Sequence, residues 1–230
     1  MSSIVYFAPV DAQDLESSIE EKVGRLFDAA GLVKSVRAQD LVGIKIHFGE
    51  KGNETFVRPS RLRLVIDRLK KAGTKPFFTD TNTLYVGMRS NSVDHVRLAA
   101  EHGFTLADTG IPVLIADGIA GGDEVEVEIG GSHFKRVGVA SGIAAADALV
   151  VVTHVTGHCA CGLGGIIKNV GMGCSSRKGK LQQHSVLKPK VEPEKCTGDF
   201  RCIRMCPADA IVKENDKARI VTETCIGCGE

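Results

Sequence analysis

Several features that mark other classes of protein are missing from this sequence of 230 residues. Tryptophan is absent and aromatic residues make up 5% of the chain, so we expect an aliphatic core. The 29 basic and 28 acidic side chains give a net charge of +1. A chain with so little excess charge has no bulk basic field for nucleic acid and no acidic tail. We therefore expect no nucleic-acid partner.

Long apolar segments and early cysteines are missing as well. No stretch approaches the roughly 20 apolar residues that span a membrane, and the N-terminus lacks the basic region and apolar length of a signal peptide. No cysteine precedes Cys159, and all eight lie in the last third of the chain, whereas small secreted proteins are dense in disulfides throughout. These absences indicate a cytoplasmic protein without membrane association, whose cysteines serve metal or redox chemistry.

Strand and helix patterns alternate over most of residues 1–155. Five segments have the apolar pattern of strands: 4–8, 41–48, 76–80, 112–116 and 148–155, the last apolar on both faces like a central strand. Four segments have helical spacing: 14–30, 60–72, 92–102 and 141–146. A hairpin is predicted where residues 125–129 and 133–139 flank Gly130-Gly131. The alternation predicts an α/β domain with a largely parallel sheet and flanking helices.

Polar side chains follow three of the predicted strands: His47, Glu50 and Asn53 after the second, Asp80 after the third, and His154 and His158 after the last. Because ligands bind beyond the carboxyl ends of parallel strands, these clusters predict one shared pocket. The alternative is that the post-strand Asp and Asn residues form turns and cap helices. The P-loop ending Gly-Lys-Ser/Thr is absent and no G-x-G-x-x-G follows the first strand, which excludes nucleotide binding by those motifs.

A glycine-rich loop spans residues 157–179. It contains seven glycines interleaved with aliphatic residues, unlike a flexible Gly/Ser linker, and this mixture predicts an ordered loop with a short helix. Glycines 162–165 lie just before the predicted helix and can expose backbone N–H groups to an anion. We therefore expect that a small anionic ligand can bind here, beside Lys168.

The motifs of this loop resemble those of the family called domain of unknown function 362: H-x3-H at His154 and His158, Gly164-Gly165, Lys168-Asn169, GMGC at 171–174 and GKLQQHS at 179–185. The segments KIHFGEKGN and FTDTNTLYVG match as well, so the resemblance spans nearly the whole chain. It implies an uncharacterised iron–sulfur-centre protein and assigns no reaction. Cys174 belongs to the family pattern, whereas Cys159 and Cys161 replace other residues and stay unassigned.

The H…GGxxK arrangement is also distantly similar to the nickel-pincer lactate racemase superfamily. That resemblance implies catalytic roles for Lys168 as a cofactor anchor and for His154 and His158 in proton transfer. Together with the strand-end clusters, the two resemblances give a set of metal-ligand candidates: His47, Asp80, Cys174 and His184. Histidine serves as either base or ligand near neutral pH. The alternative is that these histidines only form hydrogen bonds that order the loop.

Residues 186–195 contain two prolines and alternating charges, which is typical of a linker. We therefore divide the chain into an α/β domain at 1–186 and a small C-terminal module at 187–230. Bacterial-type ferredoxins bind 4Fe-4S clusters through C-x2-C-x2-C-x3-C-P. Cys196, Cys202, Cys206 and Pro207 match this motif, with Asp199 at the position of the second cysteine. A zinc ribbon is the alternative for paired cysteines.

A second ferredoxin motif begins at Cys225 and Cys228, but the sequence stops one residue before its third cysteine is due. One cluster would then use Cys196, Asp199 and Cys202, and the other Cys206, Cys225 and Cys228. Because Asp is a harder donor than thiolate, it favours labile iron, a 3Fe-4S form, or no cluster. We expect this module to be incomplete, and the chain to be a truncated piece of a longer protein.

Three functions follow from these patterns, and whether the protein is an enzyme stays open. The first is a 4Fe-4S protein in which electron transfer to a redox partner protein is coupled to a small-molecule or metal site in the α/β domain. The second is a racemase- or isomerase-like enzyme that uses Lys168 and histidines around the glycine-rich loop. The third is a non-catalytic metal-binding scaffold.

Overall fold

The computed structural model describes residues 4–158, 162–184, 189–206 and 208–225. Within these ranges no helix combines the length and the apolar character needed to cross a lipid bilayer. The unassigned Cys159 and Cys161, the predicted cluster ligand Cys228 and Pro207 of the ferredoxin motif lie outside the described residues.

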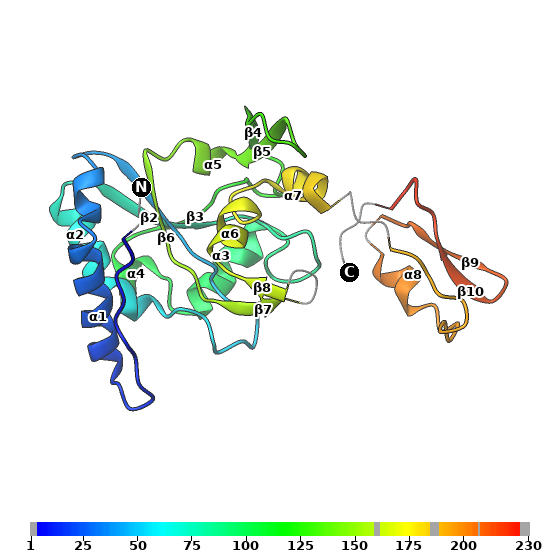
Figure 1. Ribbon diagram of the computed structural model, residues 1–230, viewed down its shortest axis with the longest axis horizontal. Coiled ribbons are helices and arrows are strands. Elements are labelled where there is room, and N and C mark those ends of the chain that lie inside the picture. Colours follow the sequence, from blue (N-terminus) through cyan, green and yellow to red (C-terminus); the bar gives the residue numbers. More distant parts are fainter. Residues whose placement is uncertain (1–3, 159–161, 185–188, 207, 226–230) are drawn as a thin grey trace.

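Four parallel strands form the central sheet (Figure 1). The strands are β1 (Leu41–Lys45), β2 (Lys75–Asp80), β3 (Val113–Ile115) and β6 (Ala148–Val151), in the order β3-β2-β1-β6. Ile44 in β1 lies opposite Phe78 in β2 on one side and Val150 in β6 on the other. With helices flanking this sheet, the predicted α/β class is confirmed.

The predicted helices are present, with shifted ends. They are α1 (Glu16–Ala29), η2 (Pro59–Leu62) leading into α2 (Arg63–Lys71), α3 (Ser92–Glu101) and α5 (Ser141–Ala144). The structure adds two short helices that the sequence pattern did not predict, η1 (Leu32–Ser35) and α4 (Leu106–Thr109). Gly73 and Gly103 follow α2 and α3 with φ of 78° and 86°. Glycine adopts this left-handed conformation with the least strain, which explains why both helices end next to a glycine.

The main core lies between the sheet and α1, α2 and α3. Its buried side chains include Val42 and Ile44 of β1 and Ile66 and Leu69 of α2. These aliphatic side chains agree with the predicted aliphatic core. The centre is aromatic, however, because Phe104 makes edge-on contacts with the rings of Phe48, at 5.0 Å, and Phe78, at 5.1 Å. A second, smaller core contains Ala140, Ile143 and Cys174.

The strand predicted at 4–8 is wrong. The segment has no strand structure, and Ile4, Val5 and Phe7 are 77%, 85% and 84% exposed. A run of strand-forming residues becomes a strand only where a neighbouring strand satisfies its backbone. None of the other described residues pairs with this segment.

The central position expected for the strand at 148–155 is also not observed, because β6 lies at one end of the strand order. Both of its faces are nevertheless packed. Ala148 and Val150 contact the main core, while Leu149 between them contacts the second core. Burial on both faces therefore arises here from two separate cores and does not require a strand on each side.

The predicted hairpin is confirmed as β4 (Glu124–Glu128) and β5 (Arg136–Ala140). The glycine-rich loop forms a short hairpin, β7 (Thr156–His158) with β8 (Gly162–Gly164), followed by α6 (Ile166–Gly171) and α7 (Arg177–His184).

The C-terminal segment contains α8 (Arg201–Met205) and the antiparallel strands β9 (Ile211–Glu214) and β10 (Lys217–Ile220). Figure 1 shows these elements to one side of the sheet. The boundary expected at 186–187 lies outside the described residues and stays a prediction, as does the ferredoxin-like character of this segment.

Replacing a core side chain should affect stability far more than replacing an equally apolar surface one. Leu69 is fully buried in the main core, whereas Ile167 on α6 is 87% exposed. We expect Leu69→Ala to lower the free energy of unfolding by about 2–5 kcal/mol, and Ile167→Ala to change it by less than about 0.5 kcal/mol. Urea unfolding curves of both variants measure this. Equal losses would contradict the described core.

Candidate functional site

Charged side chains are buried at the carboxyl ends of the parallel strands. We call Lys45, Asp80, Arg89 and His95 the buried charge cluster, because their side chains are no more than 6% exposed. Lys45 and Asp80 end β1 and β2, Arg89 lies in the loop before α3, and His95 lies on α3. Of the polar residues predicted to follow the strands, Asp80 belongs to this cluster, and the shared ligand pocket stays a prediction.

Asp80 is held between two cations. Its Oδ1 atom lies 2.8 Å from Lys45 Nζ, and its Oδ2 atom accepts a hydrogen bond of 2.8 Å from Arg89 Nη2. Burial alone would raise the pKa of Asp80, but the charges of Lys45 and Arg89 outweigh it and hold that pKa well below its usual range. Asp80 is therefore an ionised carboxylate, and both of its oxygens are occupied.

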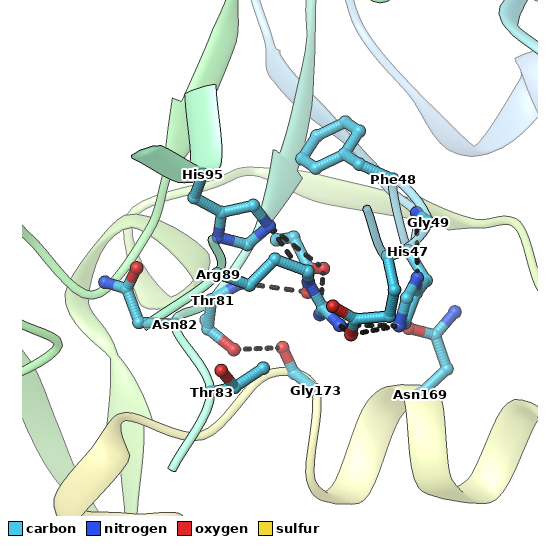
Figure 2. Close-up of polar contacts among 12 residues, drawn as sticks. His47, Phe48, Gly49, Thr81, Asn82, Thr83, Arg89, His95, Asn169 and Gly173 are labelled. Atoms are coloured by element: carbon cyan, nitrogen blue, oxygen red, sulfur yellow. Dashed lines mark hydrogen bonds and ion pairs between the residues drawn. The ribbon is translucent and has the colours of Figure 1, made fainter. Parts of the chain in front are cut away.

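Arg89 connects the cluster to a more exposed rim (Figure 2). Its Nη1 atom lies 2.5 Å from Glu50 Oε1, 2.6 Å from His47 Nε2 and 3.0 Å from Tyr85 OH. Tyr85 OH also donates to Glu50 Oε1 at 2.5 Å. The side chains of His47 and Glu50 are 46% and 38% exposed, so this rim is the accessible part of the site.

The hydrogen bonds of His95 determine its tautomer. Arg89 Nε donates to His95 Nε2 at 3.2 Å, so the proton of the neutral ring is on Nδ1. Burial lowers the pKa of His95 to about 3, which keeps the ring neutral. His95 Nδ1 is buried without a hydrogen-bond partner among the described residues, and so are Thr79 Oγ1 and Asn82 Oδ1. Such unsatisfied groups are rare in folded proteins.

His47 is contacted by a donor at each ring nitrogen. The backbone N–H of Gly49 donates to Nδ1 at 2.9 Å, and Arg89 Nη1 lies 2.6 Å from Nε2. A neutral imidazole has one acceptor nitrogen, so it cannot accept both contacts at once. Desolvation and then the charge of Arg89 lower the pKa of His47 to about 4. His47 is thus a neutral ring whose Nε2 atom lies against the guanidinium of Arg89.

A second buried lysine fixes α7 to the sheet. Lys180 Nζ donates to Thr81 Oγ1 and to the carbonyl of Ser175, both at 2.6 Å, and burial lowers its pKa to about 8. Asp117 accepts from the backbone N–H and the side-chain amide of Asn82, each at 2.9 Å, and burial raises its pKa. Asn82, which follows β2, therefore holds the loop that contains Asp117 against the end of this strand.

Asn169 explains part of the motif in the glycine-rich loop. Its Oδ1 atom accepts from Lys45 Nζ at 2.6 Å, and its Nδ2 atom donates to the carbonyl of Val152 and to Thr153 Oγ1, each at 2.9 Å. A Cβ atom on Gly173 would lie 2.2 Å from the Asn169 carbonyl oxygen and 2.8 Å from Lys45 Nζ. Asn169 and Gly173 thus fix α6 against the end of β1, and Lys168 is positioned beside them.

The predicted catalytic residues lie around that helix. His154 is exposed, whereas His158 and Lys168 are half-buried. Burial, followed by the positive charges of Lys168 and His158, lowers the pKa of His184. The charges of Lys168 and His158 therefore reach His184, a predicted metal ligand. The catalytic roles of His154, His158 and Lys168 stay predictions.

The four metal-ligand candidates His47, Asp80, Cys174 and His184 do not form one group. Asp80 is occupied by Lys45 and Arg89, and the thiol of Cys174 lies 3.9 Å from the Asn169 carbonyl oxygen. In the parts of the chain that the structure covers, no three His, Cys, Asp or Glu residues are grouped so that they could hold a metal ion.

The cysteines of the C-terminal segment receive backbone hydrogen bonds. The N–H of Ala218 donates to Cys196 Sγ at 3.5 Å, and the N–H of Ala210 donates to Cys206 Sγ at 3.2 Å. Hydrogen bonds from the backbone of Ala218 and Gly198 lower the pKa of Cys196, which favours its thiolate.

The other described ligand candidates of this segment have different surroundings. Cys202 is exposed on α8, and Cys225 is half-buried. Asp199 Oδ1 accepts from the backbone N–H of Arg201 at 3.1 Å.

Sequence reasoning missed the roles of Arg89, Lys180 and Asp117. Lys180 lies inside the motif GKLQQHS, which resembles the family pattern. The motif does not indicate that this lysine is buried. Arg89 follows the segment FTDTNTLYVG, and no pattern around it indicates an ion pair with Asp80. Arg89 and Asp80 are nine residues apart and Lys180 and Thr81 are 99 apart, and no local sequence pattern marks either contact.

Comparison with known protein families gives a match over most of the chain. The family model described as "Domain of unknown function (DUF362)" matches residues 42–223. No curated protein and no solved structure matches the chain.

Removing Lys45 should be costly because its partners stay buried. Lys45→Met leaves Asp80 with one of its two cations and the Oδ1 atom of Asn169 without its donor. We expect a loss of about 3–5 kcal/mol in the free energy of unfolding, measured by urea denaturation. The control Lys168→Met alters a half-buried lysine beside Asn169 and should cost less than about 1 kcal/mol. Similar losses in both variants would show that the Lys45 ion pair contributes little.

The neutral state of His95 predicts how stability depends on pH. The pKa of His95 is about 3 in the folded protein, against an ordinary value of 6.5. As the pH falls, His95 therefore takes up a proton in the unfolded chain at a higher pH than in the folded chain. Its contribution to stability is present above pH 6.5 and is lost as the pH falls from 6.5 towards 3. His95→Gln keeps an acceptor for Arg89 but does not titrate. We therefore expect a shallower acid-side decline for His95→Gln in unfolding free energies measured across this range; parallel declines would refute the assignment.

Proposed function

The chain belongs to the family defined by the domain of unknown function DUF362, and from that premise we propose that it is an iron–sulfur protein. The C-terminal segment binds a 4Fe-4S cluster, and the α/β domain binds a small anionic molecule near the glycine-rich loop. Electrons pass between the cluster and a redox partner protein. The proposed location is the cytoplasm, where thiols stay reduced.

The observation that carries this proposal is the pair of backbone N–H groups directed at Cys196 and Cys206 sulfur atoms. Iron–sulfur clusters are held by thiolates, and hydrogen bonds to the sulfurs tune their reduction potential. The same hydrogen bonds favour the thiolate form that binds metal. A structural cysteine in an apolar core has the opposite surroundings, as the raised pKa of buried Cys174 illustrates.

The donor atoms of the C-terminal segment are of the kind that iron–sulfur clusters bind. Soft thiolates suit iron–sulfur clusters, and Asp199 supplies one harder carboxylate. The described cysteines are not yet grouped as a metal site. Metal binding commonly completes the folding of a small site, so the cluster itself would draw its ligands together. When bound, the cluster supplies one-electron transfer. Its proposed ligands divide between two cluster positions, Cys196, Asp199 and Cys202 at one and Cys206, Cys225 and Cys228 at the other.

In the α/β domain the proposed anion site consists of Lys168 with His158 and His184. Lys168 is placed by its neighbour Asn169, which is hydrogen-bonded to β1 and to the end of β6. Lys168 supplies the positive charge of this proposed site, and the lowered pKa of His184 leaves that ring neutral and able to form hydrogen bonds. The same grouping supports the alternative of a racemase- or isomerase-like enzyme, in which Lys168 anchors a cofactor and a histidine moves a proton.

Reconstitution with iron tests the cluster. After anaerobic incubation with ferrous iron and sulfide, we expect broad visible absorption and bound iron with acid-labile sulfide. Cys202→Ser should lose most of this absorption because it removes a thiolate, and Asp199→Cys should retain iron longer during gel filtration. The matched control Cys174→Ser changes a cysteine outside the segment and should behave like the wild type.

Two outcomes would contradict the cluster assignment. One is binding of zinc alone, without visible absorption, after reconstitution with both metals present. The other is equal loss of iron in Cys174→Ser and Cys202→Ser, which would place the metal elsewhere or show nonspecific thiol binding.

A further inference from the structure

A cavity of about 370 Å³ lies between residues 56–63, which lead into α2, and the end of α3 with α4. Its volume is within the range of small-molecule sites. Its side chains include Phe56, Arg58, Arg63, Glu101, His102 and Asp108. None of these belongs to the buried charge cluster, to its rim, or to the proposed anion site at Lys168.

One wall of the cavity is a fixed pair of rings. Phe56 and His102 are stacked with centroids 4.4 Å apart and planes 11° from parallel. His102 Nδ1 lies 2.7 Å from the carbonyl oxygen of Phe48. Because a carbonyl only accepts, Nδ1 carries a proton and donates it, which holds the ring in one orientation. The wall is therefore formed before any ligand arrives.

The turn behind these rings also fits them closely. Gly49 has a φ of 94°, and a Cβ atom there would lie 2.9 Å from atoms of both Phe56 and His102. A glycine is thus needed both for the backbone conformation and for the close approach. The aromatic pair is packed against main chain and is not a mobile surface contact.

Two cationic side chains of the cavity lack partners in the described ranges. The nearby Arg61 and Arg68 are paired with Glu16 and Asp28. Arg58 and Arg63, in contrast, are exposed and form no ion pair or side-chain hydrogen bond with other described residues, although the charge of Arg58 contributes to the lowered pKa of Glu16. A guanidinium group presents a planar array of donors that matches carboxylate and phosphate oxygens.

The acidic side chains of the cavity limit the charge of a ligand. The carboxylate of Asp108 accepts from Thr105 Oγ1 at 2.6 Å as part of the cap of α4. Glu101 is exposed and makes no ion pair with the residues that the structure describes. A ligand with one anionic group near the arginines is favoured. A ligand with several anionic groups would be repelled by the carboxylates of Glu101 and Asp108.

We propose that this cavity binds a small molecule with an aromatic or similarly planar body and one terminal oxyanion, a carboxylate or a phosphate. Arg58 and Arg63 bind the oxyanion, and the body lies beside Phe56. This site is separate from the proposed cluster and anion sites, so its test does not depend on them.

Two probes of the same shape distinguish the two oxyanions. Benzoate and phenyl phosphate are titrated into the protein by isothermal calorimetry, with sodium chloride added to equalise the ionic strength. We expect at least one probe to bind with a millimolar or lower Kd. The double variant Arg58→Gln/Arg63→Gln should weaken that binding by about tenfold or more, because charge-assisted hydrogen bonds are lost.

Further variants separate the two parts of the site. Phe56→Leu should weaken the binding of benzoate or phenyl phosphate more than that of acetate or inorganic phosphate, because only the first two ligands carry a ring. Arg37→Gln removes an exposed arginine outside the cavity and serves as the control, and thermal unfolding checks that each variant folds. Absence of binding by both probes into the millimolar range, or equal affinity in the wild type and the double arginine variant, would overturn the proposal.

Discussion

The carboxylate of Asp80 lies between two buried cations, and much of the polar interior depends on that contact. Lys45 brings β1 to it and also reaches Asn169 on α6, while Arg89 brings the loop before α3 and, through Nε, His95. Each buried charge is tolerated because the others are present, since an isolated one would cost several kcal/mol. The two ion pairs, with the hydrogen bond from Lys45 to Asn169, therefore fix β1, β2, the loop before α3 and α6 relative to one another.

This arrangement also limits what the cluster can do. The oxygens of Asp80 and the guanidinium of Arg89 are already occupied, so these groups are better suited to holding loops than to binding a ligand directly. The groups that remain accessible are at the periphery. They are the rim around His47, the basic side chains near Lys168, and the cavity beside His102. Rigid interior contacts of this kind keep such peripheral groups in place, which is a general requirement for a functional site.

The sequence predicted most helices and strands because their signals are local. Periodic apolar residues and terminal glycines specify α2 and α3 without reference to the rest of the chain. Residues 4–8 show the limit of that reasoning, because a strand needs a partner that the segment's own residues do not reveal. The candidate site divides in the same way: Asp80 follows from its position at a strand end, but its pairing with Arg89 depends on tertiary structure. The cysteine spacing likewise suggested ligands, while the N–H groups directed at Cys196 and Cys206 required the fold.

The hydroxyl of Tyr85 donates to Glu50 and lies 3.0 Å from Arg89. The chain contains two tyrosines and no tryptophan, so ultraviolet-excited emission comes from Tyr85 and Tyr6 without energy transfer to an indole. A phenol that is hydrogen-bonded to a carboxylate is strongly quenched compared with one that faces water. The protein consequently carries its own fluorophore at the rim of the buried charge cluster. Opening of that rim can be followed by steady-state or lifetime spectroscopy without attaching a label.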